Sequence, residues 1–105
     1  MTTFDEREKE FEARFKHDQE LRFKVTARRN RLLGLWAAEQ MALTGESAEA
    51  YAKEVVEAEF HGGDRHVVAK IAADLAANGG TVTEAQVKFQ LDHLAETAKQ
   101  QVMRE

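Results

Sequence analysis

The placement of glycine and the absence of proline restrict the fold more than any other feature of this sequence. The 105 residues contain no proline, and five of the six glycines stand at Gly45, at Gly62 and Gly63, and at Gly79 and Gly80. Glycine just past the end of a helix accepts the left-handed conformation that termination requires. Alanine, glutamate, lysine, leucine and arginine, all favourable in helices, fill the stretches between. The pattern predicts an all-α fold whose helices end at these glycines.

The last segment has the clearest helix signals. Thr83 and Gln86 have the spacing of a capping box, and Val82 and Val87 have that of a hydrophobic staple. Apolar residues then recur along one helical face, namely Val87, Leu91, Leu94, Ala98 and Val102. We predict a helix over residues 84–103.

Two shorter helices of about four turns are predicted before it. Ser47 is the expected N-cap of the first, and Asp64 is the expected N-cap of the second. The apolar faces are Ala48, Tyr51, Ala52, Val55 and Ala58 in the first helix, and Val68, Ile71, Ala72 and Leu75 in the second. Their alanines predict close packing between helices.

The first half of the chain contains two apolar stripes that differ in phase. One runs from about residue 20 to 43 and comprises Leu21, Val25, Leu32, Leu35, Trp36 and Leu43. The other comprises Phe4, Phe11 and Phe15, which fall within about 40° on a helical wheel. In one straight helix the stripe would rotate by roughly 90° near residues 16–20, where Asp18 is a potential N-cap. We therefore predict a helical core domain, residues 20–105, and a separable N-terminal arm, residues 1–19.

The arm combines high charge with large rings. Eleven of the seventeen residues from 4 to 20 are charged, and three others are phenylalanine. Ion pairs at i, i+4 favour a helix here, although an isolated helix of this length is marginal in water. The rings need burial, either on the chain's own core domain, in a groove of a partner protein, or at a membrane surface. The net charge of −3 over residues 1–20 disfavours anionic lipid, and we interpret the arm as a docking element.

Composition excludes several classes of function. The chain has no cysteine, and its four histidines lack the spacing of a zinc site. A net charge of −4 argues against nucleic acid as a partner, and no apolar run has the ~20 residues that a membrane span needs. No nucleophile and base are placed for catalysis, so we predict a protein that is not an enzyme.

A basic stripe follows the arm. Residues 21–31 contain five bases and no acid, and Lys24, Arg28 and Arg31 lie at i, i+4 and i+7. The simpler interpretation is a solvated helix face that balances an acidic protein. The functional alternative is a site for a phosphate-bearing ligand such as ADP or ATP, or for an acidic patch on a partner. A nucleotide hydrolase is disfavoured because the sequence has no glycine-rich phosphate loop.

Three segments, FDEREKEFEARF, ELRFKVTARRNRLLGLWAAEQ and AYAKEVV, together resemble the alphaproteobacterial ATP synthase inhibitor subunit zeta family. The most specific block is ARRNRLLGLWAAE, from Ala27 to Glu39. The resemblance implies a four-helix bundle-like domain with an N-terminal inhibitory segment. In the family that segment enters a catalytic alpha/beta interface of the F-type ATP synthase and blocks rotation in the direction of ATP hydrolysis.

The resemblance also implies which residues act and where. The inhibitory segment matches here at Phe4, Asp5, Arg7, Glu8, Phe11, Glu12 and Phe15. The implied partner is the catalytic sector, made of alpha, beta and gamma subunits, with the protein cytoplasmic and peripheral on the inner-membrane synthase. It is expected to be a monomer when free, with no cofactor beyond a weak ADP or ATP ligand. The competing hypothesis is a small helical nucleotide-sensing or adaptor protein without inhibitory activity.

Overall fold

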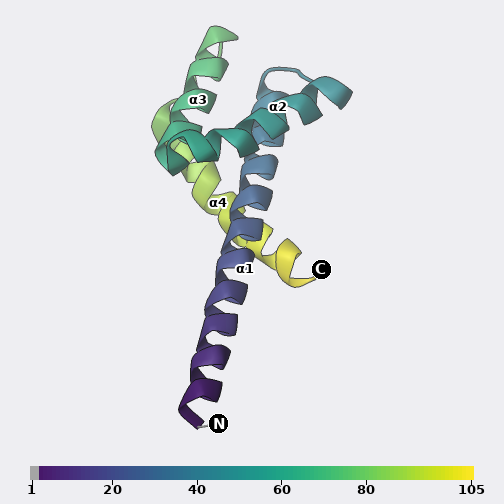
Figure 1. The fold of residues 1–105 in the computed structure, drawn as a ribbon. Coiled ribbons are helices and arrows are strands. Elements are labelled where there is room, and N and C mark those ends of the chain that lie inside the picture. The colour runs from purple at the N-terminus through teal and green to yellow at the C-terminus, as the bar shows by residue number, and fades with distance from the viewer. Residues whose placement is uncertain (1–2) are drawn as a thin grey trace.

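The computed structural model describes the backbone of residues 3–105 and the side chains of residues 9, 10 and 16–105. Four α-helices form this part of the chain, with one short 3-10 turn and no strand (Figure 1). In chain order they are α1 (Thr3–Gln40), α2 (Gly45–Ala58), the 3-10 turn η1 (Glu59–His61), α3 (Gly63–Ala77) and α4 (Glu84–Met103). The predicted all-α, bundle-like fold is confirmed.

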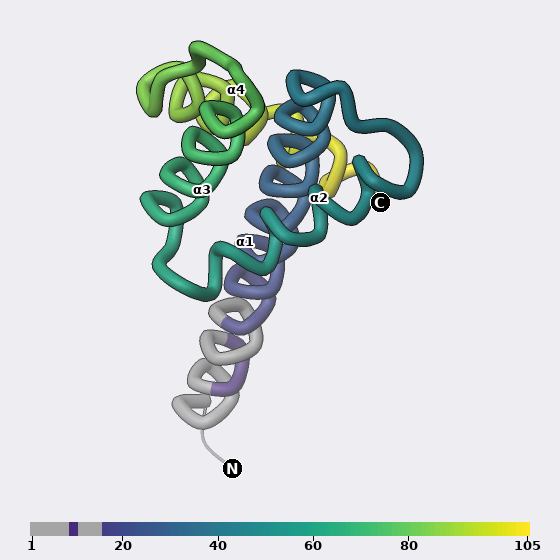
Figure 2. Tube along the Cα trace, turned by 90° about the horizontal axis from the view of Figure 1, so that it is seen from above, coloured from purple at the N-terminus to yellow at the C-terminus, as the bar shows by residue number. Residues whose placement is uncertain are grey.

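Helix α1 is the axis of the molecule. The other three helices gather around its C-terminal half, and its N-terminal half extends away from them (Figures 1 and 2). The molecule therefore measures 65 × 24 × 20 Å, far longer in one direction than in the others. Along its packed half, α1 contacts α2 and α4 most extensively and α3 less.

The uninterrupted α1 corrects the predicted helix start at Asp18, which lies inside the helix and caps nothing. The phase conflict between the two apolar stripes has a simple resolution. The described side chains from Lys16 to Glu20 are exposed, and Leu21 is the first after them with partial burial. Only the later part of α1 packs on the core, so one helix need not bury both stripes in the same place.

The buried side of α1 also differs from the predicted stripe. Leu33, Ala37 and Ala38 are fully buried, whereas Leu32 and Trp36 are only half-buried. Because α1 lies between α2 and α4, two neighbours together cover a face that a single-stripe pattern does not indicate. The predicted faces of α2 and α4 are confirmed, and α3 buries Val67 in addition to its predicted stripe.

The capping box of α4 is confirmed. The Gln86 amide donates to Thr83 Oγ1 at 3.2 Å, and the Thr83 amide donates to Gln86 Oε1 at 2.8 Å. The other two predicted caps are wrong. Helix α2 begins at Gly45, before Ser47, and α3 begins at Gly63, which places Asp64 in the first turn. Asp64 has another partner, described below.

Helix α1 ends at Gln40, three residues before the predicted end. The Leu43 amide donates to the Ala38 carbonyl at 2.9 Å, and the Ala42 amide donates to the Glu39 carbonyl at 3.1 Å. These two hydrogen bonds form a Schellman motif, and Ala42 takes the left-handed position with φ of 59°. The sequence predicted a glycine in the left-handed position at helix ends. This holds at the end of α3, where Gly79 has φ of 82°.

Candidate functional site

The predicted inhibitory residues lie in the first turns of α1. The backbone there is helical from Thr3 onward. The side chains of Phe4, Asp5, Arg7, Glu8, Phe11, Glu12 and Phe15 lie outside the described residues. The structure therefore gives the position of this segment relative to the core domain, but it does not test the roles of the seven side chains.

The helix that contains this segment is continuous with the folded core. A helix that extends from a folded helix needs no new nucleus, and nucleation is the costly step in helix formation. An arm that belongs to α1 therefore extends an existing helix, which lowers the free-energy cost of forming it. At ~1.5 Å per residue, residues 3–20 span about 27 Å of helix.

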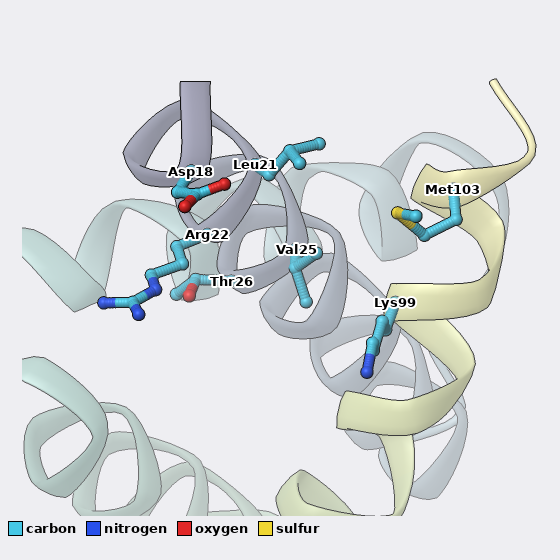
Figure 3. Close-up of a pocket in the computed structure, with 7 residues that line it drawn as sticks. All are labelled: Asp18, Leu21, Arg22, Val25, Thr26, Lys99 and Met103. Carbon is cyan, nitrogen blue, oxygen red and sulfur yellow. The ribbon is translucent and has the colours of Figure 1, made fainter. Parts of the chain in front are cut away.

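An apolar groove lies where the arm joins the core, between α1 and the C-terminal end of α4. It has a volume of about 460 Å³. Leu21 and Val25 from α1 and Met103 from α4 provide its apolar surface, as Figure 3 shows. Its polar margin consists of Asp18, Arg22, Thr26 and Lys99. The junction therefore exposes apolar surface at the base of the arm.

The three residues of the basic stripe lie together. Lys24, Arg28 and Arg31 line a second hollow, of about 360 Å³, along with Phe23, Ala27, Val56, Val102 and Glu105. Arg28 donates to Gln101 Oε1 at 3.0 Å and forms an ion pair with Glu105, while Arg31 pairs with Glu49 at 2.9 Å. The proximity predicted from spacing is thus present, but two of the three charges already have acidic partners.

These ion pairs weaken the hollow as a phosphate site. The Glu105 carboxylate lines the same hollow, where it would repel an anion. Binding of ADP or ATP at Lys24, Arg28 and Arg31 stays a prediction from the sequence. In the described part of the chain, no three His, Cys, Asp or Glu side chains are grouped to hold a metal ion. No helix there is long and apolar enough to cross a membrane.

A buried polar cluster links α1 to the start of α3, and sequence reasoning missed it. Arg29 Nη2 donates to Asp64 Oδ1 at 2.7 Å and to Glu59 Oε1 at 2.8 Å. Asn30 is fully buried, and its Nδ2 donates to the same Glu59 oxygen at 2.7 Å. Arg29 is 9% exposed. One signal in the sequence could have indicated that these two side chains are buried. Arg29 and Asn30 lie one helical turn before Leu33 and Gly34, and therefore on the same buried face of α1.

This cluster fixes the direction of α1. Planar guanidinium groups that contact two carboxylates hold their partners in a defined geometry. Hydrogen bonding to Arg29 lowers the pKa of the Asp64 carboxyl below its usual value. The contact joins the middle of α1 to η1 and to the first turn of α3.

Sequence reasoning also missed an aromatic pair on the surface. Phe23 of α1 and Phe60 of η1 have ring centroids 6.0 Å apart, with planes tilted by 38°. Phe23 is 59% exposed and Phe60 is 67% exposed. The two residues are 37 positions apart in sequence, and only the turn at η1 brings them together, so periodicity gave no signal.

Comparison with known proteins agrees with this architecture. A family model described as ATPase inhibitor subunit zeta matches residues 1–101. A protein whose structure was determined in solution by NMR is 40% identical to this chain and superimposes with a TM-score of 0.71. That match covers 80% of this chain and 96% of the other. A search among curated proteins finds no match.

Proposed function

The chain belongs to the ATPase inhibitor subunit zeta family, and we propose that it inhibits ATP hydrolysis by inserting its arm into a catalytic alpha/beta interface of the F-type ATP synthase. The observation that most supports the proposal is the continuity of α1. One helix runs from Thr3 to Gln40, and the core domain packs around its later half. The earlier half projects from the molecule and is free of the core along Lys16–Glu20.

Inhibition in this proposal is steric and thermodynamic. A helix that binds one conformation of a cycling interface more tightly than the others holds the cycle there, in proportion to the difference in affinity. Blocking the rotation of gamma needs no reaction on the inhibitor, and the protein is proposed to catalyse none. The arm binds where alpha and beta subunits meet, and gamma stops as a consequence.

The seven arm residues are proposed to have two roles, with three that anchor the arm by hydrophobic burial and four that fix its orientation in the interface. Phe4, Phe11 and Phe15 are the hydrophobic anchors, since each ring fully removed from water contributes ~1.5–3 kcal/mol. The charged residues Asp5, Arg7, Glu8 and Glu12 are proposed to pair with charged groups at the interface, which favours one register over others. A helix already formed before binding loses less conformational entropy than a disordered segment does.

Deletion of residues 2–15 tests this proposal. We expect the truncated protein to stay folded, so its far-ultraviolet circular dichroism, divided by the number of helical residues that remain, should equal that of the full chain. We also expect it to lose inhibition of ATP hydrolysis by the cognate catalytic sector. The core domain should stay folded because the buried side chains that the structure describes all lie at Arg29 or later in the chain. Full inhibition by the truncated protein would overturn the assignment of the arm.

The proposed location follows from the proposed partner. A protein that acts on the catalytic sector is placed at the cytoplasmic face of the inner membrane, as a monomer bound to the synthase. Purification of the synthase from native membranes in mild detergent should therefore recover this chain at about one copy per complex. Its absence from an intact, active complex would favour the adaptor hypothesis.

A further inference from the structure

The rings of Phe23 and Phe60, which we call the aromatic patch, contact each other and leave most of their surface open to solvent. Each is more than half exposed, and they touch each other across two separate elements, α1 and η1. Single exposed apolar residues are normal on protein surfaces. Two large rings that meet from distant parts of the chain instead form a continuous apolar surface, which is typical of a contact site.

The surroundings of the patch indicate the charge of its partner. Hollows lie on both sides of Phe23, and their charged lining comprises the bases Lys16, Lys24, Arg28 and Arg31 and the acids Glu20 and Glu105. Arg28 and Arg31 are paired with Glu105 and Glu49, which leaves Lys16, Lys24 and Glu20 outside these two ion pairs. Lys24 forms no ion pair with any side chain that the structure describes. Lys24 is therefore the charge beside Phe23 that can pair with an acidic group of a partner.

The position of the patch indicates which partner would cover it. Phe23 is on the same uninterrupted helix as the arm, eight residues after Phe15. At ~1.5 Å per residue this separation is about 12 Å along α1. A protein that encloses the arm as far as residue 15 therefore lies next to the patch without any change in the shape of the core domain.

We infer that the aromatic patch is a second contact surface for the partner that binds the arm, and that it takes an acidic segment with an aliphatic or aromatic anchor. This inference rests on the proposed function. The anchor packs on the exposed surfaces of Phe23 and Phe60, and its acidic neighbours pair with Lys24. A second contact on the same partner raises the local concentration of the arm at its interface, which increases overall affinity without adding to the inhibitory contact itself.

The inference separates affinity from inhibition, and a double substitution tests it. We expect Phe23→Ser with Phe60→Ser to raise the concentration for half-maximal inhibition about tenfold, the change typical of losing an aromatic anchor. Inhibition at saturation should stay complete because the arm is intact. The matched control is Phe89→Ser on α4, whose ring is 68% exposed and lies outside the patch. That control should inhibit like the wild type.

A charge reversal provides a second, independent readout. Lys24→Glu should also weaken inhibition, and the difference from wild type should diminish as salt is raised, because exposed charge pairs are screened. Wild-type half-maximal concentrations for both the double variant and Lys24→Glu would overturn the inference. So would a concentration-dependent dimer of the wild type, seen by sedimentation, that the double substitution abolishes, since the patch would then bind a second copy of this chain.

Failure of this inference is distinguishable from failure of the proposed function. If the patch variants inhibit like the wild type while deletion of residues 2–15 abolishes inhibition, only the second contact is wrong. If the truncated protein still inhibits fully, the arm assignment is wrong whatever the patch variants do. Melting temperatures of all variants, measured alongside, confirm that each is folded when assayed.

Discussion

At the scale of single residues, Arg29 connects α1 to η1 and to the start of α3. Its guanidinium contacts Asp64, Glu59 and the side chain of Asn30. In the part of the chain that the structure describes, no buried side-chain nitrogen or oxygen lacks a hydrogen-bond partner. Removal of Arg29 would leave the Asn30 side-chain oxygen without a donor, although Asn30 Nδ2 would still donate to Glu59. A buried polar group left unpaired costs ~1–3 kcal/mol, so Arg29 completes the hydrogen bonding of this cluster.

Asp64 makes this cluster sensitive to acid. Its pKa in the folded state lies below the usual 3.8, chiefly because Arg29 donates hydrogen bonds to it. A depressed pKa contributes stability above the unfolded-state pKa, and that contribution is lost as pH falls through the folded-state value. We expect the difference in free energy of unfolding between wild type and Asp64→Asn to be largest near pH 7 and to shrink towards about pH 2.

Urea unfolding at several pH values measures this difference. Asp92→Asn is a suitable control, because Asp92 pairs with Lys88 on the exposed face of α4. That exposed pair contributes little, ~0–1 kcal/mol, so its removal should change the unfolding free energy only slightly at every pH. A difference for Asp64→Asn that stayed constant from pH 7 to about pH 2 would contradict the role assigned to its carboxylate.

At the scale of elements, the close approach of α1 and α2 depends on Gly34. A methyl group added at Gly34 would lie 2.7 Å from the Ala52 Cα and 3.2 Å from the Val55 Cβ. The nearest of these atoms belongs to the backbone of α2, which cannot move aside as a flexible side chain can. The two helices therefore cross where neither has a large side chain, which agrees with the close packing predicted from the alanines of α2.

Gly34→Ala is expected to destabilise the protein even though alanine is the better helix former. The gain in helix propensity is ~1 kcal/mol, while forcing extra atoms into a packed contact costs ~1–3 kcal/mol and moves the helices apart. The control is Thr97→Ala, an exposed position on α4 where higher propensity should slightly stabilise. Thermal unfolding of both variants checks this. A melting temperature for Gly34→Ala above that of wild type would contradict the tight crossing.

Much of this arrangement could be predicted from the sequence, and the errors have physical causes. The last helix was predicted accurately because the capping box of Thr83 and Gln86 is local chemistry. The predicted N-caps Ser47 and Asp64 were wrong because α2 and α3 begin at glycines that precede them. The Asp64 carboxylate instead accepts a hydrogen bond from Arg29, 35 positions earlier in the chain. The buried face of α1 was misplaced because two neighbouring helices, and not one, cover it.

The candidate site was predicted unevenly for a similar reason. The arm could be proposed from the sequence because its rings, charges and resemblance lie in one continuous stretch, and the roles of its side chains stay predictions. The proximity of Lys24, Arg28 and Arg31 also followed from helical spacing, but their acidic partners Glu49 and Glu105 come from other helices. The pairing of Phe23 with Phe60 depends on the turn at η1. Contacts between distant segments were the part that periodicity could not indicate.

At the scale of the whole molecule, the fold separates a compact bundle from a projecting helix. The long axis of 65 Å belongs to α1 and not to the bundle, whose other helices have at most 20 residues. Among the side chains that the structure describes, the buried apolar core runs from Leu33 to Val102. Substitutions in the arm should therefore change binding to the synthase without changing the stability of the fold.

The most direct test of this account compares inhibition with stability for the double variant Phe4→Ala, Phe11→Ala. Half-maximal inhibition of ATP hydrolysis by the cognate catalytic sector is measured together with the melting temperature. We predict at least a tenfold higher inhibitory concentration, since two rings lose burial worth ~1.5–3 kcal/mol each, and a melting temperature equal to that of wild type. A clear fall in melting temperature with unchanged inhibition would mean that the rings stabilise this protein's own core, and would contradict the account.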